Sequence, residues 1–145
     1  MMIILDTNVI SELMRAEPDP RVIAWLDAQP PETVWTTSIS VFEISFGLNS
    51  LPDGRRKHSL QDAFEAMLTE ELQQHVLDFD QVAAERAGQI SAKLRGLGRS
   101  VEIRDVQIAG IVSVRHASLA TRNRKHFQET GISILCPWDD RPSTG

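Results

Sequence analysis

The chain has 145 residues, of which 41% are hydrophobic, so it is expected to fold as one ordinary domain with a sizeable core. Its single cysteine excludes an internal disulfide and a cysteine-rich zinc site. Because no signal-like start or long apolar run is present, we expect a cytoplasmic protein without a membrane span. The net charge of −5 is weak evidence against nucleic-acid binding.

The first part of the chain predicts alternating strands and helices. An apolar run at residues 2–5 predicts a buried strand, and apolar residues at helical spacing predict a helix over 7–15. A short second helix is predicted over 21–28, after two prolines. The β-branched and aromatic run at 33–37 predicts the next strand, and a helix follows from about 40 to 49.

The middle of the chain predicts two longer helices and a strand. Residues 55–71 form a charged amphipathic helix, and 76–79 are the next strand candidate. Asp80 is a favoured N-cap for a helix that the glycines at 96 and 98 should end. The inward stripe of that helix comprises Ala83, Ala87, Ile90, Leu94 and Leu97.

The last predicted elements are a buried helix and two strands. Asp105 is expected to open a helix that is apolar around most of its circumference and so packs deep against the sheet. Strands follow at 118–121 and 132–135. This alternation indicates an α/β fold: one domain over residues 1–137 with a mostly parallel sheet flanked by helices. Residues 138–145 are expected to form a short polar tail.

Four oxygen-bearing side chains are predicted to meet at the carboxyl edge of this sheet, where parallel sheets bind their ligands. They are Asp6, Glu43, Asp105 and Asn123. Three clustered carboxylates raise one another's pKa, and a bound divalent cation removes that conflict. We expect Mg²⁺, with Mn²⁺ as a substitute, because such ions take oxygen ligands and activate water for attack on a phosphodiester.

Each of these residues also has a purely structural interpretation. Asp6 and Asp105 are suitable N-caps, and Asn123 suits a turn. Ser40 and Glu43, three residues apart, fit a capping box. The metal site and the set of caps remain alternatives on the sequence alone.

Five further polar residues flank the four and are candidate substrate contacts. They are Thr7, Arg104, Thr121, Arg122 and Arg124. The threonines can bond a carboxylate or phosphate, or make local turn bonds. The arginines can contact a phosphate or lie solvated on the surface. The histidines at 116 and 126 are not spaced as a metal pair and are interpreted as structural or surface residues.

Basic residues are concentrated in one part of the chain. Residues 86–126 hold nine Lys and Arg against two acids, a local net charge of +7, whereas residues 1–85 hold five against 15. This asymmetry indicates either a footprint for phosphates or a solvated basic face, and charge alone does not separate the two.

The order and spacing of several motifs resemble the PIN-domain family over nearly the whole chain, and most of all its VapC toxins of the FitB-like branch. The motifs are LDTNVISEL at 5–13, the helix start at 40–43, DVQIAGI at 105–111, ATRNRKHF at 120–127 and the late Pro137-Trp138. The family's first three acids match Asp6, Glu43 and Asp105. Its fourth position, often Asp, is Asn123 here, which can ligate Mg²⁺ but adds no charge.

The resemblance implies a Mg²⁺-dependent endoribonuclease that is the toxin of a type II toxin–antitoxin pair. Its implied partners are an RNA substrate and a cognate VapB/FitA-like antitoxin, which in turn binds operator DNA. A homodimer is also implied. Arg104 would then contact a phosphate of the RNA or a carboxylate of the antitoxin.

Other classes fit the sequence less well. A haloacid-dehalogenase phosphatase needs a second Asp where Asn8 stands, and a response-regulator receiver needs an Asp and a Lys at strand ends that are not convincingly present. The stronger alternative is a non-catalytic PIN domain that acts as an RNA-binding or antitoxin-binding regulatory module. Asn123 favours this alternative, and the three retained acids argue against it.

Overall fold

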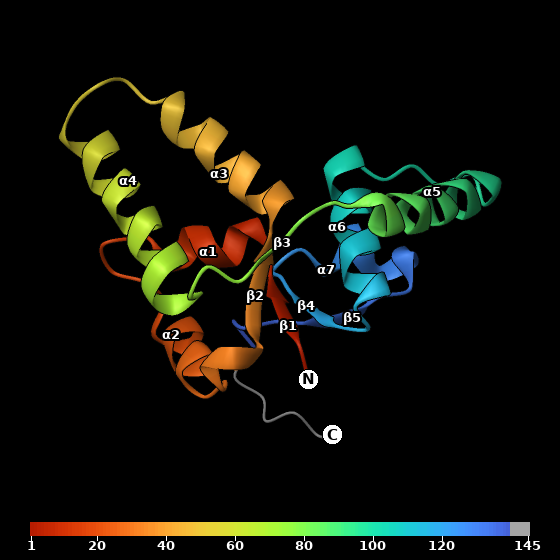
Figure 1. The fold of residues 1–145 in the computed structure, drawn as a ribbon, viewed down its shortest axis with the longest axis horizontal. Helices are drawn as coiled ribbons and strands as arrows, with labels where there is room; N and C mark the ends of the chain where they lie inside the picture. Colours follow the sequence, from red (N-terminus) through yellow and green to blue (C-terminus); the bar gives the residue numbers. More distant parts are fainter. Residues whose placement is uncertain (140–145) are drawn as a thin grey trace.

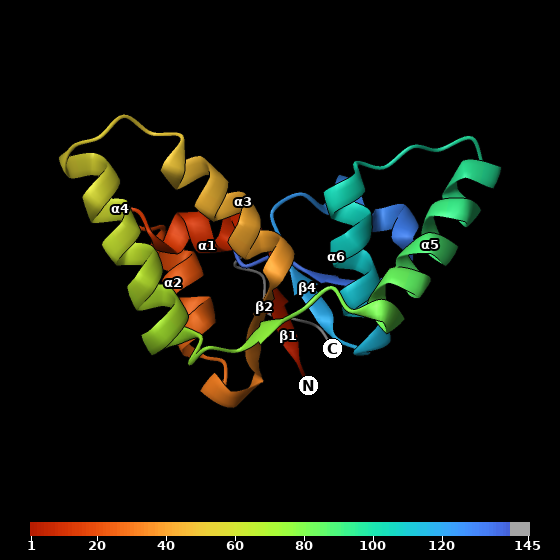
Figure 2. The same cartoon turned by 45° about the horizontal axis from the view of Figure 1, so that its top comes forward.

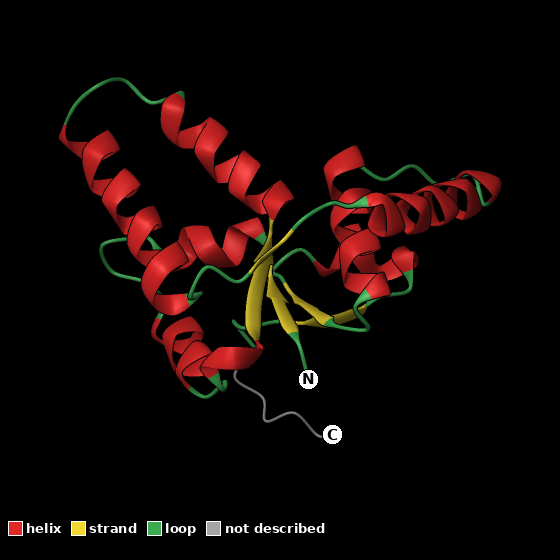
Figure 3. Ribbon diagram, viewed as in Figure 1, coloured by secondary structure: helices red, strands yellow, loops and turns green. Residues whose placement is uncertain are grey.

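A parallel β-sheet runs through the centre of the computed structural model, which describes residues 1–139 (Figure 1 and Figure 3). Within these residues the sheet has five strands in the order β3-β2-β1-β4-β5, and all neighbouring pairs are parallel. The strands are β1 (Ile3–Leu5), β2 (Val34–Thr37), β3 (Val76–Leu77), β4 (Ser118–Ala120) and β5 (Ser133–Leu135). The predicted α/β class is therefore confirmed.

The strand order reverses between β1 and β4. The chain adds β2 and β3 on one side of β1 and then crosses to place β4 and β5 on the other side. Such a reversal leaves a crevice beyond the carboxyl ends of the two central strands, where open parallel sheets bind their ligands. The topology thus identifies where a site is expected.

Helices cover the sheet in two groups, which stand on either side of it in Figure 2. The first group comprises α1 (Thr7–Leu13), α2 (Pro20–Asp27), α3 (Ser38–Asn49) and α4 (Arg55–Ala66), with a π-helical turn at Met67–Glu71. The second comprises α5 (Gln81–Gly96), α6 (Ile103–Val114) and α7 (Arg124–Phe127). Short 3₁₀ turns lie at Pro31–Thr33 and Gln128–Thr130.

Alternate residues of β1 face the two helical groups. Ile3 and Leu5 belong to the core cluster of α1, α2, α3 and α4, whereas Ile4 belongs to that of α5, α6 and α7. All three are buried. Burial on both faces explains why this strand appears in the sequence as a continuous apolar run.

The start of α3 differs from the prediction. The helix begins at Ser38, because the hydroxyl of Thr37 accepts a hydrogen bond from the N–H of Ser40 at 3.1 Å and so caps it. Ser40 therefore lies inside the helix. The proposed capping box between Ser40 and Glu43 is wrong, which leaves the Glu43 carboxylate without a capping role.

The start of α6 also differs from the prediction. The helix begins at Ile103 and its N-cap is Glu102, whose carboxylate accepts from the N–H groups of Arg104 (2.9 Å) and Asp105 (3.4 Å). Asp105 therefore lies in the first turn and does not open the helix. Its carboxylate is not used as a cap.

The helix after β3 follows the prediction at its start and departs from it at its end. Asp80 caps α5 by accepting from the N–H of Ala83 at 2.9 Å. Leu97 is wrongly placed on the inward stripe: it is 63% exposed, because the helix ends at Gly96 and Leu97 lies past it.

The end of the described chain packs against the domain. Trp138 is 7% exposed and belongs to the core cluster of the first helical group. Residues 140–145, most of the expected polar tail, lie outside the described residues. Within residues 1–139, no helix has the length and apolar character that a membrane span requires.

Helices α5 and α6 pack so closely that one position leaves no room for a side chain. A Cβ on Gly110 of α6 would lie 2.6 Å from the carbonyl oxygen of Ala83 and 2.8 Å from the Cβ of Ala87. The residues around Gly110 are fully buried, as the sequence predicts for this helix: Ile108, Ala109, Ile111 and Val112.

Gly110→Ala should lower the free energy of unfolding by about 1–3 kcal/mol, because it overpacks this contact. Gly88→Ala on α5 is the matched control, since nothing lies within 4 Å of its added Cβ. The control should raise stability by up to about 1 kcal/mol through helix propensity. Urea unfolding measures both, and equal effects in the two variants would contradict the close packing.

Candidate active site

Asp6 directly follows β1 and is held by the neighbouring strand. Leu5 is in register with Ala120 of β4, and the N–H of Asp6 donates to the Ala120 carbonyl at 2.9 Å. Thr121 is thereby placed to donate its hydroxyl to Asp6 Oδ2 at 2.8 Å, while the N–H of Thr7 donates to Oδ1 at 2.8 Å. Asp6 is thus the N-cap of α1 and also a buried carboxylate at the reversal of strand order.

Asn8 braces this arrangement. Its amide group donates to Thr121 Oγ1 at 3.2 Å and to Asp6 Oδ2 at 3.4 Å, and its carbonyl accepts from the N–H of Arg122 at 3.1 Å. The side chain therefore links the ends of β1 and β4. The sequence pattern used Asn8 only as evidence against a haloacid-dehalogenase phosphatase and did not predict that it links the two strand ends.

The other two acids each have a basic neighbour. Glu43, on α3, has its Oε2 3.9 Å from Nη1 of Arg104. Asp105, on α6, has its Oδ2 3.3 Å from Nδ1 of His126. Among the described residues no basic group lies within ion-pair distance of Asp6. The most deeply buried of the three carboxylates is therefore also the one without an ion pair among the described residues, although the charge of His126 lowers its pKa from a longer distance.

Most of the predicted site residues line one open cavity of about 800 Å³ at the reversal. They are Asp6, Thr7, Glu43, Arg104, Asp105, Arg122 and Asn123. Thr121 is fully buried and donates its hydroxyl to the Asp6 carboxylate, which agrees with the prediction that it can bond a carboxylate. Thr7 donates its hydroxyl to Ser40 at 3.0 Å, so in this structure the hydroxyl links α1 to α3 and makes neither a carboxylate bond nor a local turn bond.

Arg124 is the one predicted site residue that neither lines the cavity nor bonds to Asp6 in the described structure. Its Nη2 pairs with Asp139 Oδ2 at 3.3 Å. Asn123, by contrast, lines the cavity as an exposed residue whose side chain does not cap α7.

His126 and Trp138 also line the cavity, although the sequence interpretation left them out of the site. The side chain of His126 is 57% exposed, so a surface position is correct, but it faces Asp105. Its spacing of three residues from Asn123 would have placed both on one face of a short helix. Trp138 supports Arg122, whose guanidinium carbon lies 5.0 Å from the centre of the indole ring.

Burial raises the pKa of all three acids, and the negative charge of Asp6 raises the pKa of Glu43 and Asp105 further. For Asp6 burial is the largest cause, and the hydrogen bonds from Thr121 and Thr7 oppose it. For Glu43 and Asp105 burial is again the largest cause, and the negative charge of Asp6 is the next. The acids are therefore close enough to affect one another's protonation, as the sequence predicted.

The donor set suits a hard divalent cation, because it consists of carboxylate and amide oxygens whose repulsion such an ion relieves. The side chains do not already converge on one point. Within residues 1–139 no group of three or more Asp, Glu, His or Cys is arranged to hold one ion. Binding therefore requires these side chains to turn toward each other from the pairs that Glu43 and Asp105 make with Arg104 and His126.

Asp6→Asn should lower the pKa of Glu43 and Asp105, although burial should still keep both above their ordinary values. NMR titration of the metal-free protein measures this directly. A folded chain with raised carboxyl pKa values binds protons more tightly than the unfolded chain. These two acids should therefore add to the free energy of unfolding as the pH falls from neutral toward their pKa values, and this contribution should disappear as the pH rises through them.

This pH dependence should be weaker in Asp6→Asn than in the natural chain. Asp53→Asn is the matched control, since the Asp53 side chain is 98% exposed and does not line the cavity. If Glu43 and Asp105 titrate identically in the natural chain and in Asp6→Asn, the three acids do not form one electrostatic cluster.

Comparison with known proteins agrees with this arrangement of motifs. The PIN domain family model matches residues 3–132. The chain is 38% identical over 138 residues to VapC ribonuclease Y4jK of Sinorhizobium fredii, covering 95% of this chain and 99% of that protein. It is 33% identical over 139 residues to Toxin FitB of Neisseria gonorrhoeae, covering 96% of this chain and 100% of that protein.

A solved structure of FitAB bound to an IR36 DNA fragment has the same fold. It matches with a TM-score of 0.88 at 32% identity, covering 98% of this chain and 99% of that chain. The sequence, the fold and the acids at the reversal of strand order therefore lead to one conclusion: this chain belongs to the PIN-domain family.

Proposed function

We propose that this chain is a Mg²⁺-dependent endoribonuclease, able to use Mn²⁺, and the toxin component of a VapBC-type toxin–antitoxin pair. One observation carries the proposal: Asp6, Glu43 and Asp105 line a single cavity at the reversal of a parallel sheet. The relatives named as a VapC ribonuclease and as a FitB toxin support the class of reaction and the role.

The metal would be held by Asp6, Glu43 and Asp105 together with the amide oxygen of Asn123. When bound, such an ion lowers the pKa of a coordinated water and neutralises charge on the phosphoryl oxygens. Asp6 has the greatest need of a cation, because it is buried and has no ion pair among the described residues. Thr7 and Thr121 fix its two carboxylate oxygens by hydrogen bonds, which orients them before any ligand arrives.

Arg122 is proposed to bind the phosphate that reacts. Its backbone is fixed by Asn8, and its guanidinium rests on Trp138. Arg122 lines the cavity, so its N–H groups can donate to a phosphate bound there. Arg104 is less available, because it lies near Glu43 and 3.6 Å from Glu102.

The proposed partner is a small VapB/FitA-like antitoxin, which would link the toxin to operator DNA only indirectly. The support is the near full-length similarity to Toxin FitB and to a chain in the structure of FitAB bound to a DNA fragment. We also propose that the toxin forms a homodimer. Co-expression with the neighbouring reading frame, followed by size determination of the purified complex, tests both partners.

Mg²⁺ should raise the melting temperature of the natural chain and support cleavage of RNA, because a ligand that binds only the folded state stabilises it by mass action. Asp105→Asn should remove both effects and lower kcat/KM by on the order of a hundredfold or more, the scale of losing one charge-stabilising contact. Thermal melts and cleavage of total RNA, each with Mg²⁺ or with NaCl of equal ionic strength, measure this.

Asp53→Asn should keep both the metal-induced shift and the cleavage, because its carboxylate is exposed and lies outside the cavity. Cleavage that persists in Asp105→Asn would place the reaction elsewhere. A natural chain that binds RNA and metal but cuts nothing would favour the non-catalytic regulatory module.

Asn123→Asp should be tolerated by the fold and should tighten Mg²⁺ binding. Asn123 is exposed and its side chain makes no capping bond, and Asp is an equally good residue before a helix. The added charge would give the ion a fourth acidic ligand. Isothermal titration with Mg²⁺ measures the change, and unchanged binding would show that Asn123 is not near the metal.

A further inference from the structure

A second cavity opens beside the first and shares a wall with it. Its volume is about 440 Å³, and it lies between α7 and the segment that joins α5 to α6. Three residues line both cavities: Glu102, Asp105 and His126. A ligand that extends past Asp105 from the first cavity therefore enters the second.

Two cations stand in the second cavity, Arg99 and Lys125. Arg99 is held by Glu129, with Nε 3.2 Å from Oε2, and both side chains remain about half exposed. Lys125 has no acidic partner among the described residues. Its charge is therefore available to an anion.

The acids of this cavity are already engaged. Glu102 accepts from two N–H groups at the start of α6, Glu129 pairs with Arg99, and Asp105 faces His126. The hydroxyl of Ser100, on the connecting segment, has no partner in the described structure and adds a further donor. Among the described lining residues, the groups left without a partner are thus donors, the Lys125 ammonium and the Ser100 hydroxyl, which suit an anion.

We propose that this second cavity is a subsite for a phosphodiester of RNA, adjacent to the phosphate that is cut. Lys125 and Arg99 bind it from two sides, and the strand passes along Asp105 and His126 between the two cavities. The inference rests on the proposed ribonuclease function. It explains why part of the basic stretch of the chain gathers beside an acidic site, because a polyanion needs cations on the path that leads to that site.

An acidic segment of a protein partner is the competing occupant, since carboxylates also bind Lys and Arg. The shared wall favours RNA. A strand with regularly repeated phosphates fits two adjoining cavities, one at the reacting centre and one at a fixed step from it.

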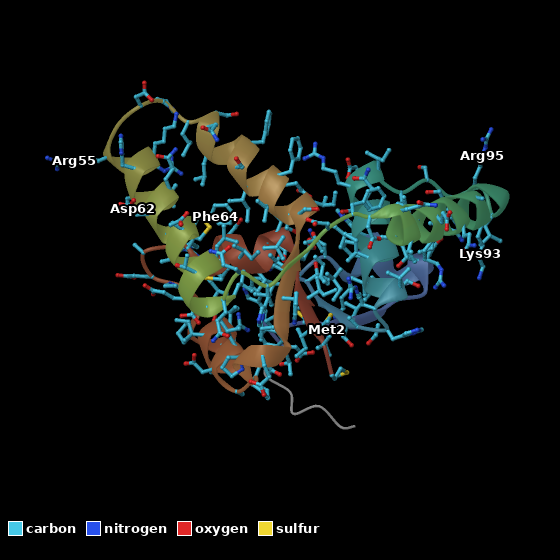
Figure 4. All side chains as sticks on the ribbon, in the orientation of Figure 1. Met2, Arg55, Asp62, Phe64, Lys93 and Arg95 are labelled. Carbon is cyan, nitrogen blue, oxygen red and sulfur yellow. The ribbon has the colours of Figure 1, made fainter. Side chains whose placement is uncertain are left out.

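The test compares two double variants that remove the same charges. Arg99→Ala with Lys125→Ala empties the second cavity of its cations. Lys93→Ala with Arg95→Ala is the control, because both residues project from the far end of α5, away from the sheet (Figure 4). Neither control residue lines either of the two cavities.

Binding of a labelled single-stranded RNA of mixed sequence is measured in EDTA, so that no cleavage occurs. The cavity variant should bind roughly tenfold more weakly than the natural chain, as expected for lost charge-assisted contacts. Its plot of log affinity against log salt should be less steep by about 0.7 for one phosphate contact. On total RNA with Mg²⁺ its KM should rise while kcat stays the same, because the subsite binds the substrate and the transition state equally.

The control variant should match the natural chain in all three measurements. If the natural chain binds and cuts RNA but the two double variants behave alike, the subsite is overturned and the proposed function stands. A natural chain that neither binds nor cuts RNA overturns both the subsite and the proposed function. Unchanged RNA binding with a weakened hold on a polyglutamate peptide would assign the cavity to an acidic protein partner and so overturn the proposal.

Discussion

A hydrogen bond of 2.8 Å, from the hydroxyl of Thr121 to the carboxylate of Asp6, joins the ends of the two strands between which the sheet reverses. It forms only because Leu5 and Ala120 are in register. A shift of one residue in this pairing would turn the side chains at the strand ends to the opposite face. The geometry of the cavity therefore depends on the registration of β1 and β4.

This arrangement places a carboxylate where the protein can solvate it only in part. Asp6 receives hydrogen bonds from Thr7, Thr121 and Asn8, yet burial still raises its pKa. Glu43 and Asp105 each have a basic group within 4 Å, whereas Asp6 has no ion pair among the described residues and only the more distant charge of His126. The unbalanced charge is thus concentrated at one position, which is the condition under which a cation binds with a large gain in electrostatic energy.

The sequence predicted the order of the elements well because burial on both faces of a parallel sheet leaves long apolar runs, which are easy to detect. The four metal candidates could also be placed, since each lies just after a strand or at the start of a helix. Cap assignments were less certain: Thr37 and Glu102 cap helices that were expected to begin at Ser40 and Asp105. A cap depends on one local side-chain bond, and several neighbouring residues can make it.

The partners of the site were harder to predict because they come from tertiary contacts. Asn8 contacts Thr121 across 113 positions of sequence, and no local pattern encodes that distance. Trp138 was assigned to a polar tail because the residues after it are polar, whereas its own indole is buried beneath Arg122. Arg124 was grouped with Arg122 by adjacency, yet it turns to Asp139. Neighbours in sequence at a helix start point in different directions.

The net charge of −5 gives a poor guide to what this protein binds, because the two signs have different locations. The acids of the first half supply Asp6 and Glu43 to the cavity. The fold sends the residues of the basic stretch to different places. Arg104 and Arg122 line the first cavity, and Arg99 and Lys125 line the second. Arg86 instead donates to Ser113 at 2.8 Å. An acidic centre that can hold a metal ion, with cations in the two adjoining cavities, is suited to a polyanion. The summed charge of the chain conceals this arrangement.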